Sequence, residues 1–219
     1  TNIDMEDFGF DIESLIDEKP AEIIEDEIPS KVETRCKLGD LWILGSHRLV
    51  CGDSTDVAVI DRLMDGVKAD MVFTDPPYGI SIVNDKGQVG AGNLAKNRTY
   101  SKVIADDTTE TAQDAYGILS TLCDKLIIWG GNYFLEFLPP SDGWIVWDKR
   151  RDMTSNNFAD GEMAWCSFHT PVRIYHQLWN GMIREGEHED RVHPTQKPVK
   201  MLGEVLQDFS KENEVIVDV

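Results

Sequence analysis

The alternation of short apolar runs with helical patterns is the feature of this 219-residue chain that most constrains its fold. Apolar residues recur at helical spacing in residues 57–64, about 109–123 and about 198–209, and the short apolar runs around them have the length of strands. Strands that alternate with helices predict an α/β domain with a mostly parallel sheet that is covered on both faces. The expected strands cover residues 41–44, 48–51, 70–74, 126–129, 144–147, 162–168, 172–178 and 214–219.

Two segments lack such a pattern. Residues 79–108 contain many Gly, Asn, Lys and Ser residues without apolar periodicity, which favours a long mobile loop. Residues 1–37 form an acidic block, and its first 35 residues contribute −9 to the net charge of −19. A charged segment of this kind is typical of a solvated linker or tail. We therefore place the folded domain at residues 38–219.

Composition limits the classes of function. No apolar run approaches the roughly 20 residues of a membrane-spanning helix, so no membrane partner is expected. The four cysteines lie far apart and lack the paired spacing of a zinc site, which indicates reduced thiols in a cytoplasmic protein and no metal centre. The large negative charge argues against a sequence-independent DNA-binding protein.

The motif Asp75-Pro76-Pro77-Tyr78 follows the apolar strand expected at residues 70–74. The Asp75 carboxylate and the Pro76 carbonyl can each accept a hydrogen bond from an exocyclic amino group. Tyr78 can stack on a planar ring, a role that uses its ring and not its hydroxyl. These residues suit the binding of an amine-bearing heterocycle. A plain strand-ending turn is the alternative, because proline is an ordinary turn residue.

A second motif, Thr195-Gln196-Lys197, lies within the string that begins at His193 and enters the last expected helix. A hydroxyl, an amide and an ammonium group beside a helix N-terminus can bind the carboxylate and amine of an amino-acid group. Taken alone, the string also fits a proline-capped helix start. Asp53 is ambiguous: it either faces a ligand crevice at a strand end or caps the following helix.

The two motifs occur in this order, about 115 residues apart, and residues 38–219 resemble the beta-class amino-methyltransferases of the phage type, which are often joined to a ParB-like domain. The resemblance implies a circularly permuted, Rossmann-like sheet that transfers a methyl group from S-adenosylmethionine to adenine N6 of a flipped-out DNA base. Cytosine N4 is the alternative target. The residues implied as catalytic are Asp75, Pro76, Pro77 and Tyr78, and those implied as cofactor-binding are Asp53, Thr195, Gln196, Lys197 and Asp218.

The resemblance also implies double-stranded DNA as the partner, in a bacterial or phage-infected cell, with a homodimer left open. Phosphate contacts are expected from basic residues of the loop and of a DNA-facing region at about 149–192. These residues are Lys86, Lys96, Arg98, Lys102, Lys149, Arg150 and Arg151.

One departure from the family pattern concerns the cofactor loop. In this family a Phe-x-Gly-x-Gly loop wraps the cofactor after the strand represented here by residues 215–219, and the sequence stops short of it. We therefore expect a domain truncated at its C-terminus, whose last strand lies at an exposed sheet edge. A catalytically incompetent DNA-binding remnant is the alternative function.

Overall fold

The computed structural model describes residues 34–85, 87–89, 100–151, 153–154, 159–180, 183–185, 193 and 195–219. Helices and strands alternate along these residues, which confirms the predicted α/β class. The elements are β1 (Leu41–Leu44), β2 (His47–Val50), α2 (Val57–Met64), β3 (Met71–Thr74), α3 (Glu110–Leu119), β4 (Leu126–Trp129), the short 3-10 helix η2 (Gly131–Tyr133), β5 (Trp144–Asp148), β6 (Gly161–Cys166), β7 (Arg173–His176), β8 (Trp179–Asn180), β9 (Ile183–Arg184), α4 (Val199–Phe209) and β10 (Ile216–Val217).

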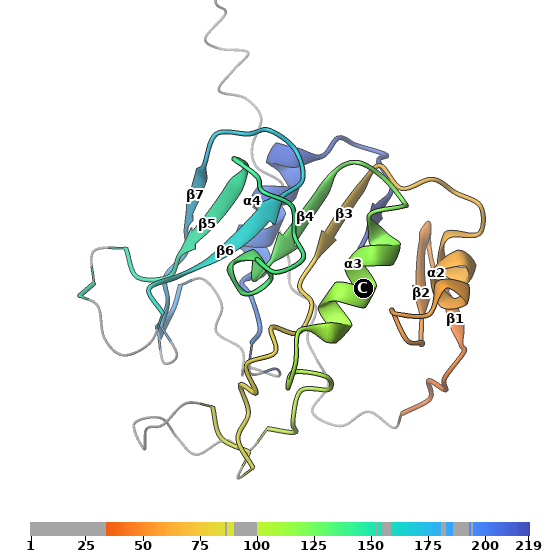
Figure 1. Cartoon of the computed structure of the whole chain (residues 1–219), viewed down its shortest axis with the longest axis horizontal. Helices are drawn as coiled ribbons and strands as arrows, with labels where there is room; N and C mark the ends of the chain where they lie inside the picture. The colour runs from red at the N-terminus through yellow and green to blue at the C-terminus, as the bar shows by residue number, and fades with distance from the viewer. Residues whose placement is uncertain are drawn as a thin grey trace, which may run out of the picture. The chain divides into compact units, whose positions relative to one another are not determined.

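Six strands form the central sheet in the order β10-β3-β4-β6-β5-β7 (Figure 1). β10, β3 and β4 are parallel to one another, and β7 is parallel to β5. β6 is antiparallel to both of its neighbours, β4 and β5. Five of the six strands therefore point the same way, so the prediction of a mostly parallel sheet is confirmed. The reversed strand β6 is a feature that the prediction did not contain.

The sheet is covered on both faces because successive side chains of a strand point to opposite sides. Val72 of β3 packs with residues of α2 and α3, whereas Met71 and Phe73 belong to the cluster that includes Met201 and Val205 of α4. Figure 1 accordingly shows α3 in front of the sheet and α4 behind it. Burying each such side chain contributes roughly 1.5–3 kcal/mol. The face covered by α4 is called the α4 face below.

Several element ends follow from local chemistry. Helix α2 begins after Asp56, whose carboxylate accepts a hydrogen bond from the Ala58 N–H at 2.9 Å. Helix α3 ends at Leu119, although the sequence predicted a helix to about residue 123. The hydroxyls of Ser120 and Thr121 donate to carbonyls three residues earlier, which competes with helical pairing and tightens the chain into turns.

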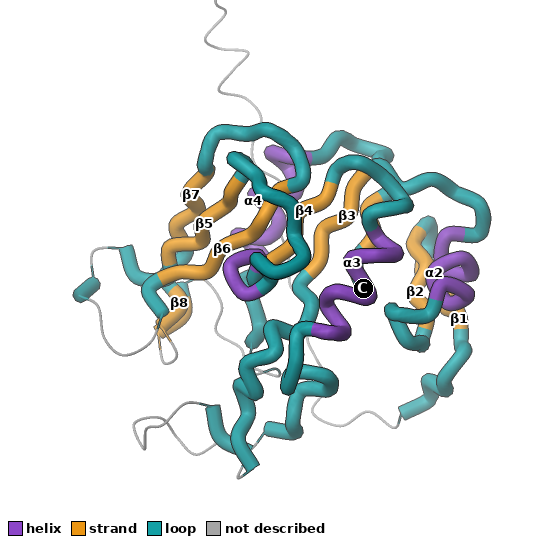
Figure 2. The backbone as a smooth tube through the Cα atoms, viewed as in Figure 1, coloured by secondary structure: helices purple, strands orange, loops and turns teal. Residues whose placement is uncertain are grey.

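The described parts of residues 79–108 contain no helix and no strand beyond one isolated bridge, and Figure 2 draws them as loop. Their two ends are tied together by Asp106, which is only 5% exposed. Its carboxylate accepts hydrogen bonds from the backbone N–H groups of Gly79, Ile80 and Ile82 at 3.0, 3.3 and 2.8 Å. The base of the loop is thus fixed to one buried side chain.

Two further observations complete the architecture. β10 occupies one edge of the described sheet, where it pairs with β3, and it is shorter than the strand expected at residues 214–219. Among the described residues, no helix combines the length and the apolar character that crossing a bilayer requires.

Candidate active site

A cavity of about 310 Å³ lies at the edge of the sheet where β3 and β4 end. Residues 73–78 line it from one side, residues 195–197 from another, and Asp218 joins them. The two motifs found in the sequence therefore meet in space, although more than 100 residues separate them. Ligands of open α/β sheets commonly bind beyond the carboxyl ends of the strands, as this cavity would allow. Its volume is near the lower end of the roughly 300–1,000 Å³ of small-molecule sites.

Asp75 is the exposed residue of the first motif, whereas Pro76 is buried. The Oδ1 atom of Asp75 accepts a hydrogen bond from the Tyr78 hydroxyl at 2.7 Å, and its Oδ2 atom forms an ion pair with Nζ of Lys197. A carboxylate oxygen has two lone pairs, so each Asp75 oxygen keeps one for a further donor. The carboxylate is thus held from one side and can still accept a hydrogen bond from a ligand amine.

The ring of Tyr78 is already packed against protein. It stacks on Tyr133, with ring centroids 5.1 Å apart, and meets Phe134 edge-on. Gly130 makes this position possible, because a Cβ atom there would lie 2.2 Å from the Tyr78 ring. Burial, followed by the negative charge of Asp75, raises the pKa of the Tyr78 hydroxyl well above its ordinary value. The hydroxyl therefore stays protonated and donates to Asp75.

The Lys197 ammonium group is buried among three oxygen atoms. Its side chain is 5% exposed, and Nζ contacts Asp75, the Tyr78 hydroxyl at 3.0 Å and Oε2 of Glu162 at 3.4 Å. It also lies over the rings of Trp129 and Tyr78. An ammonium group has three donors, and three oxygens surround this one. The predicted contact of Lys197 with a cofactor tail would require it to exchange one of these partners.

Glu162, at the start of β6, is a site residue that the sequence analysis missed. Its Oε1 atom pairs with Lys149, and its Oε2 atom pairs with Lys197. Burial alone would raise the pKa of Glu162, but the charges of Lys197 and Lys149 outweigh it and hold the pKa below the ordinary value. The one signal in the sequence was a charged residue within an otherwise apolar strand.

The remaining residues of the cofactor prediction divide into two groups. Thr195, Gln196 and Asp218 line the cavity, and their binding of a cofactor stays a prediction. Asp53 does not line it, since β2 belongs to the separate hairpin with β1 and not to the central sheet. The Asp53 carboxylate accepts hydrogen bonds from the N–H and hydroxyl of Thr55, which lower its pKa. The alternative role of Asp53 as the cap of the next helix is wrong, because Asp56 caps α2.

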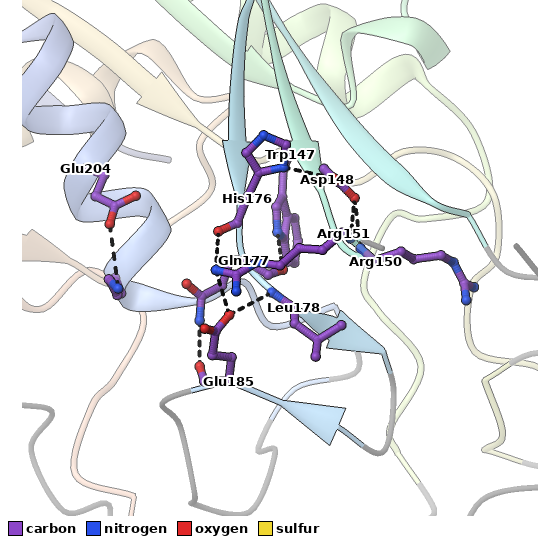
Figure 3. A network of polar contacts seen from close by, with 10 residues as sticks. Trp147, Asp148, Arg150, Arg151, His176, Gln177, Leu178, Glu185 and Glu204 are labelled. Carbon is purple, nitrogen blue, oxygen red and sulfur yellow. Dashed lines mark hydrogen bonds and ion pairs between the residues drawn. The ribbon is translucent and has the colours of Figure 1, made fainter. Parts of the chain in front are cut away.

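The described cations of the predicted phosphate-binding set are all paired with carboxylates. The prediction that Arg150 contacts DNA phosphate is contradicted most clearly, because Arg150 is 4% exposed and forms an ion pair with Asp160 at 2.5 Å. Arg151 pairs with Glu185 at 2.9 Å, within the polar network of Figure 3. Lys102 pairs with Asp85, and Lys149 pairs with Glu162.

The other cations of that set, Lys86, Lys96 and Arg98, lie outside the described residues. The region at about 149–192 is described only in part, so its predicted contact with DNA stays a prediction. Within the described ranges, no group of three or more His, Cys, Asp or Glu side chains is arranged to hold a metal ion.

Comparison of the chain with protein-family models, with curated proteins and with solved structures finds no match to any of them.

Proposed function

We propose that this protein is an S-adenosylmethionine-dependent DNA methyltransferase that methylates adenine N6. The observation that supports this proposal most strongly is the single cavity that both sequence motifs line. Asp75 and Tyr78 contribute the amine-binding motif, and Thr195 and Gln196 contribute the motif suited to an amino-acid group. Cytosine N4 is the alternative target, because it presents the same kind of exocyclic amine.

The lining of the cavity fits the cofactor by chemical type. Phe73 and Trp129 offer aromatic surface, Thr195 and Gln196 offer a hydroxyl and an amide, and Asp218 offers a carboxylate. The indole N–H of Trp129, in a side chain 1% exposed, has no hydrogen-bond partner among the described residues. Buried donors are rarely left unpaired, so an acceptor on a bound ligand would satisfy this one. When bound, the cofactor supplies a methyl group that its sulfonium already activates.

The task of the protein is then to orient and polarise the amine of the base. The amine is a poor nucleophile because its lone pair is delocalised into the ring. A hydrogen bond from the amine to Asp75 favours a pyramidal nitrogen with an available lone pair. Tyr78 and Lys197 hold the carboxylate in place before the reaction, so little reorganisation is needed as charge develops. The proton leaves the nitrogen during or after transfer, and alignment supplies most of the rate.

The target amine lies inside the duplex, so the base must be flipped out to reach the cavity. Tyr133 is 44% exposed and stacks on Tyr78, so it presents aromatic surface next to the motif. Base–aromatic stacking contributes roughly 1–3 kcal/mol per base. In this proposal the flipped base packs against the Tyr78–Tyr133 pair.

Transfer of a labelled methyl group tests the proposal. The protein is incubated with S-adenosylmethionine labelled on its methyl group and with double-stranded DNA, and the digested nucleosides are identified by mass spectrometry. We expect label in N6-methyladenine, and none with the Asp75→Asn variant. Label in N4-methylcytosine would favour the alternative target. Binding of DNA without any transfer would favour the incompetent remnant and overturn the proposal.

We further propose that the sheet is a circularly permuted form of the methyltransferase sheet. The order of the two motifs along the chain supports this proposal.

A further inference from the structure

We infer that Glu162 is a positioning residue for methyl transfer, which holds Lys197 against Asp75 and Tyr78 and so fixes the carboxylate that receives the amine. The inference rests on the proposed function, because it gives a role to a residue within that same site. Glu162 does not line the cavity, whereas Lys197 and Asp75 do. Glu162 therefore acts through Lys197 and has no contact with the substrate.

The reversed direction of β6 brings Glu162 to this edge of the sheet. Trp129, the last residue of β4, pairs with Ala164 of β6, so Glu162 lies beyond the end of β4. Because β6 runs antiparallel, its first residues lie where the neighbouring strands finish. A strand parallel to β4 would have placed its first residues at the opposite edge.

Strand alternation also sets the face on which these groups meet. Side chains two residues apart share a face, so Glu162 points to the side of Ala164 and Cys166, which belong to the cluster on the α4 face. Asp75 follows Phe73 at the same spacing and reaches that face too. Lys197 lies two residues before the first residue of α4 and contacts both carboxylates.

The resulting network alternates in charge along Lys149, Glu162, Lys197 and Asp75 and has no net charge. The side chains of Lys149, Glu162 and Lys197 are 18%, 23% and 5% exposed, so water screens their charges little. Removing one partner of a buried pair leaves an uncompensated charge. Without the Glu162 charge, Lys149 loses its carboxylate partner, and Lys197 loses the contact that holds it opposite Asp75.

Kinetics of the Glu162→Gln variant test the inference, with Glu204→Gln as the matched control. Glu204 lies on α4 and pairs with Lys200 at 3.9 Å, with a side chain 45% exposed, so its removal alters an ion pair outside the site. We expect Glu162→Gln to lower kcat by about tenfold or more while KM for the cofactor changes by less than about threefold, because a positioning residue acts on the transfer step. The control should keep wild-type values.

Two further measurements separate positioning from folding. The Glu162→Asp variant keeps the charge on a shorter side chain, and we expect it to recover part of the lost kcat. The ¹⁵N signal of the Lys197 ammonium group, assigned by its loss in Lys197→Arg, should be visible in the wild type and in Glu204→Gln but shifted or lost in Glu162→Gln. This signal reports the contact without requiring activity.

The possible results distinguish the two proposals. An active wild type whose Glu162→Gln variant keeps kcat, or keeps the Lys197 signal unchanged, overturns the inference and leaves the proposed function standing. A wild type that transfers no methyl group overturns the proposed function, and with it the catalytic role of Glu162. If Glu162→Gln fails to fold, the Glu162→Asp variant provides the test. Wild-type kcat together with an unchanged Lys197 signal in this variant, despite its shorter side chain, would overturn the positioning role.

Discussion

Tyr78 contributes to the site through two different parts of its side chain. Its hydroxyl donates to Asp75 and accepts from Lys197, while its ring packs on Tyr133. The sequence pattern indicated only the ring, because stacking on a planar base needs no hydroxyl. The geometry gives the hydroxyl the more specific task, which is to link the two motifs.

This division leads to a first prediction. Hydrogen bonds to charged groups contribute about 1.5–3 kcal/mol, so Tyr78→Phe should lower kcat by about tenfold or more. Tyr78→Ala should lower it further, because it removes the stack as well. Steady-state methyl transfer on duplex DNA measures both effects. A Tyr78→Phe variant with wild-type kcat would show that stacking alone carries the role.

Gly130 limits where the Tyr78 ring can lie. Its φ of +74° is in the left-handed region, and an added Cβ would overlap the Tyr78 ring. Gly130→Ala should therefore lower the free energy of unfolding by about 1–3 kcal/mol and displace the ring. Gly117→Ala is the matched control, since Gly117 lies within α3 with nothing within 4 Å, and we expect it to stabilise the protein by about 0.5–1 kcal/mol. Urea unfolding of the three proteins measures both effects, and equal destabilisation by the two substitutions would contradict this account.

The charge of Glu162 gives a pH dependence with a defined sign. Its pKa in the folded protein lies below the ordinary value of 4.5, so the ionised group stabilises the folded state above that pH. The contribution is lost as the pH falls below about 4.5 and through the folded-state pKa. We expect the free energy of unfolding of Glu162→Gln to depend less on pH than that of the wild type below about pH 5. If the free energies of unfolding of the two proteins changed in parallel with pH in this range, the ion pairs of Glu162 would not be the source of the pH dependence.

At the scale of elements, Asp106 ties the two ends of the loop at residues 79–108. Asp106→Ala would leave the N–H groups of Gly79, Ile80 and Ile82 without their acceptor, and a buried unpaired donor costs about 1–3 kcal/mol. We expect faster cleavage within residues 79–108 during limited proteolysis. Asp107→Ala, at an exposed neighbouring position, is the control and should be cleaved at the wild-type rate. Equal rates for both variants would show that the loop is held by other contacts.

The local elements could be predicted from the sequence, and their pairing could not. The strand Leu126–Trp129 and the helix Val57–Met64 have the predicted bounds, because apolar spacing and the turn at Gly66 are local signals. The direction of β6 is decided by its neighbours, and no pattern within Gly161–Cys166 encodes it. This is why Glu162 was missed.

The partners of charged residues were equally hidden. The run from Lys149 to Arg151 has the composition of a solvated surface, yet tertiary contacts bury Arg150 and direct Lys149 to Glu162. Asp106 lies in a segment without periodicity, so its backbone partners could be recognised only in the structure. The motifs at Asp75 and Lys197 were predictable, whereas the ion pair between them was not.

At the scale of the whole molecule, the balance of charge limits the DNA binding that we propose. The chain carries a net charge of −19, and the described cations of the predicted phosphate-binding set already have carboxylate partners. In the proposed complex, DNA phosphates would therefore compete with these carboxylates. We expect weak binding that falls steeply with added salt, since such contacts release counterions.

Deleting residues 1–35 tests the electrostatic part of this picture. The deletion removes a net charge of −9, so it should strengthen non-specific binding to duplex DNA. Fluorescence anisotropy with a labelled duplex at two salt concentrations measures the change, which should shrink at the higher salt. Weaker binding after the deletion would mean that this segment itself contributes to DNA binding.

The pairing of β3 with β10 also sets a requirement on how the protein is made. Asp70 and Val215, which are hydrogen-bonded to each other at this pair, are 145 residues apart. At roughly 5–20 residues per second, the ribosome adds the second strand about 7–30 s after the first. During that interval one edge of β3, whose four residues are all buried in the folded protein, has no partner strand, and unpaired edges of this kind promote aggregation. Slow translation before residue 215 should therefore lower the yield of soluble protein, and a chaperone that covers the nascent chain should restore it.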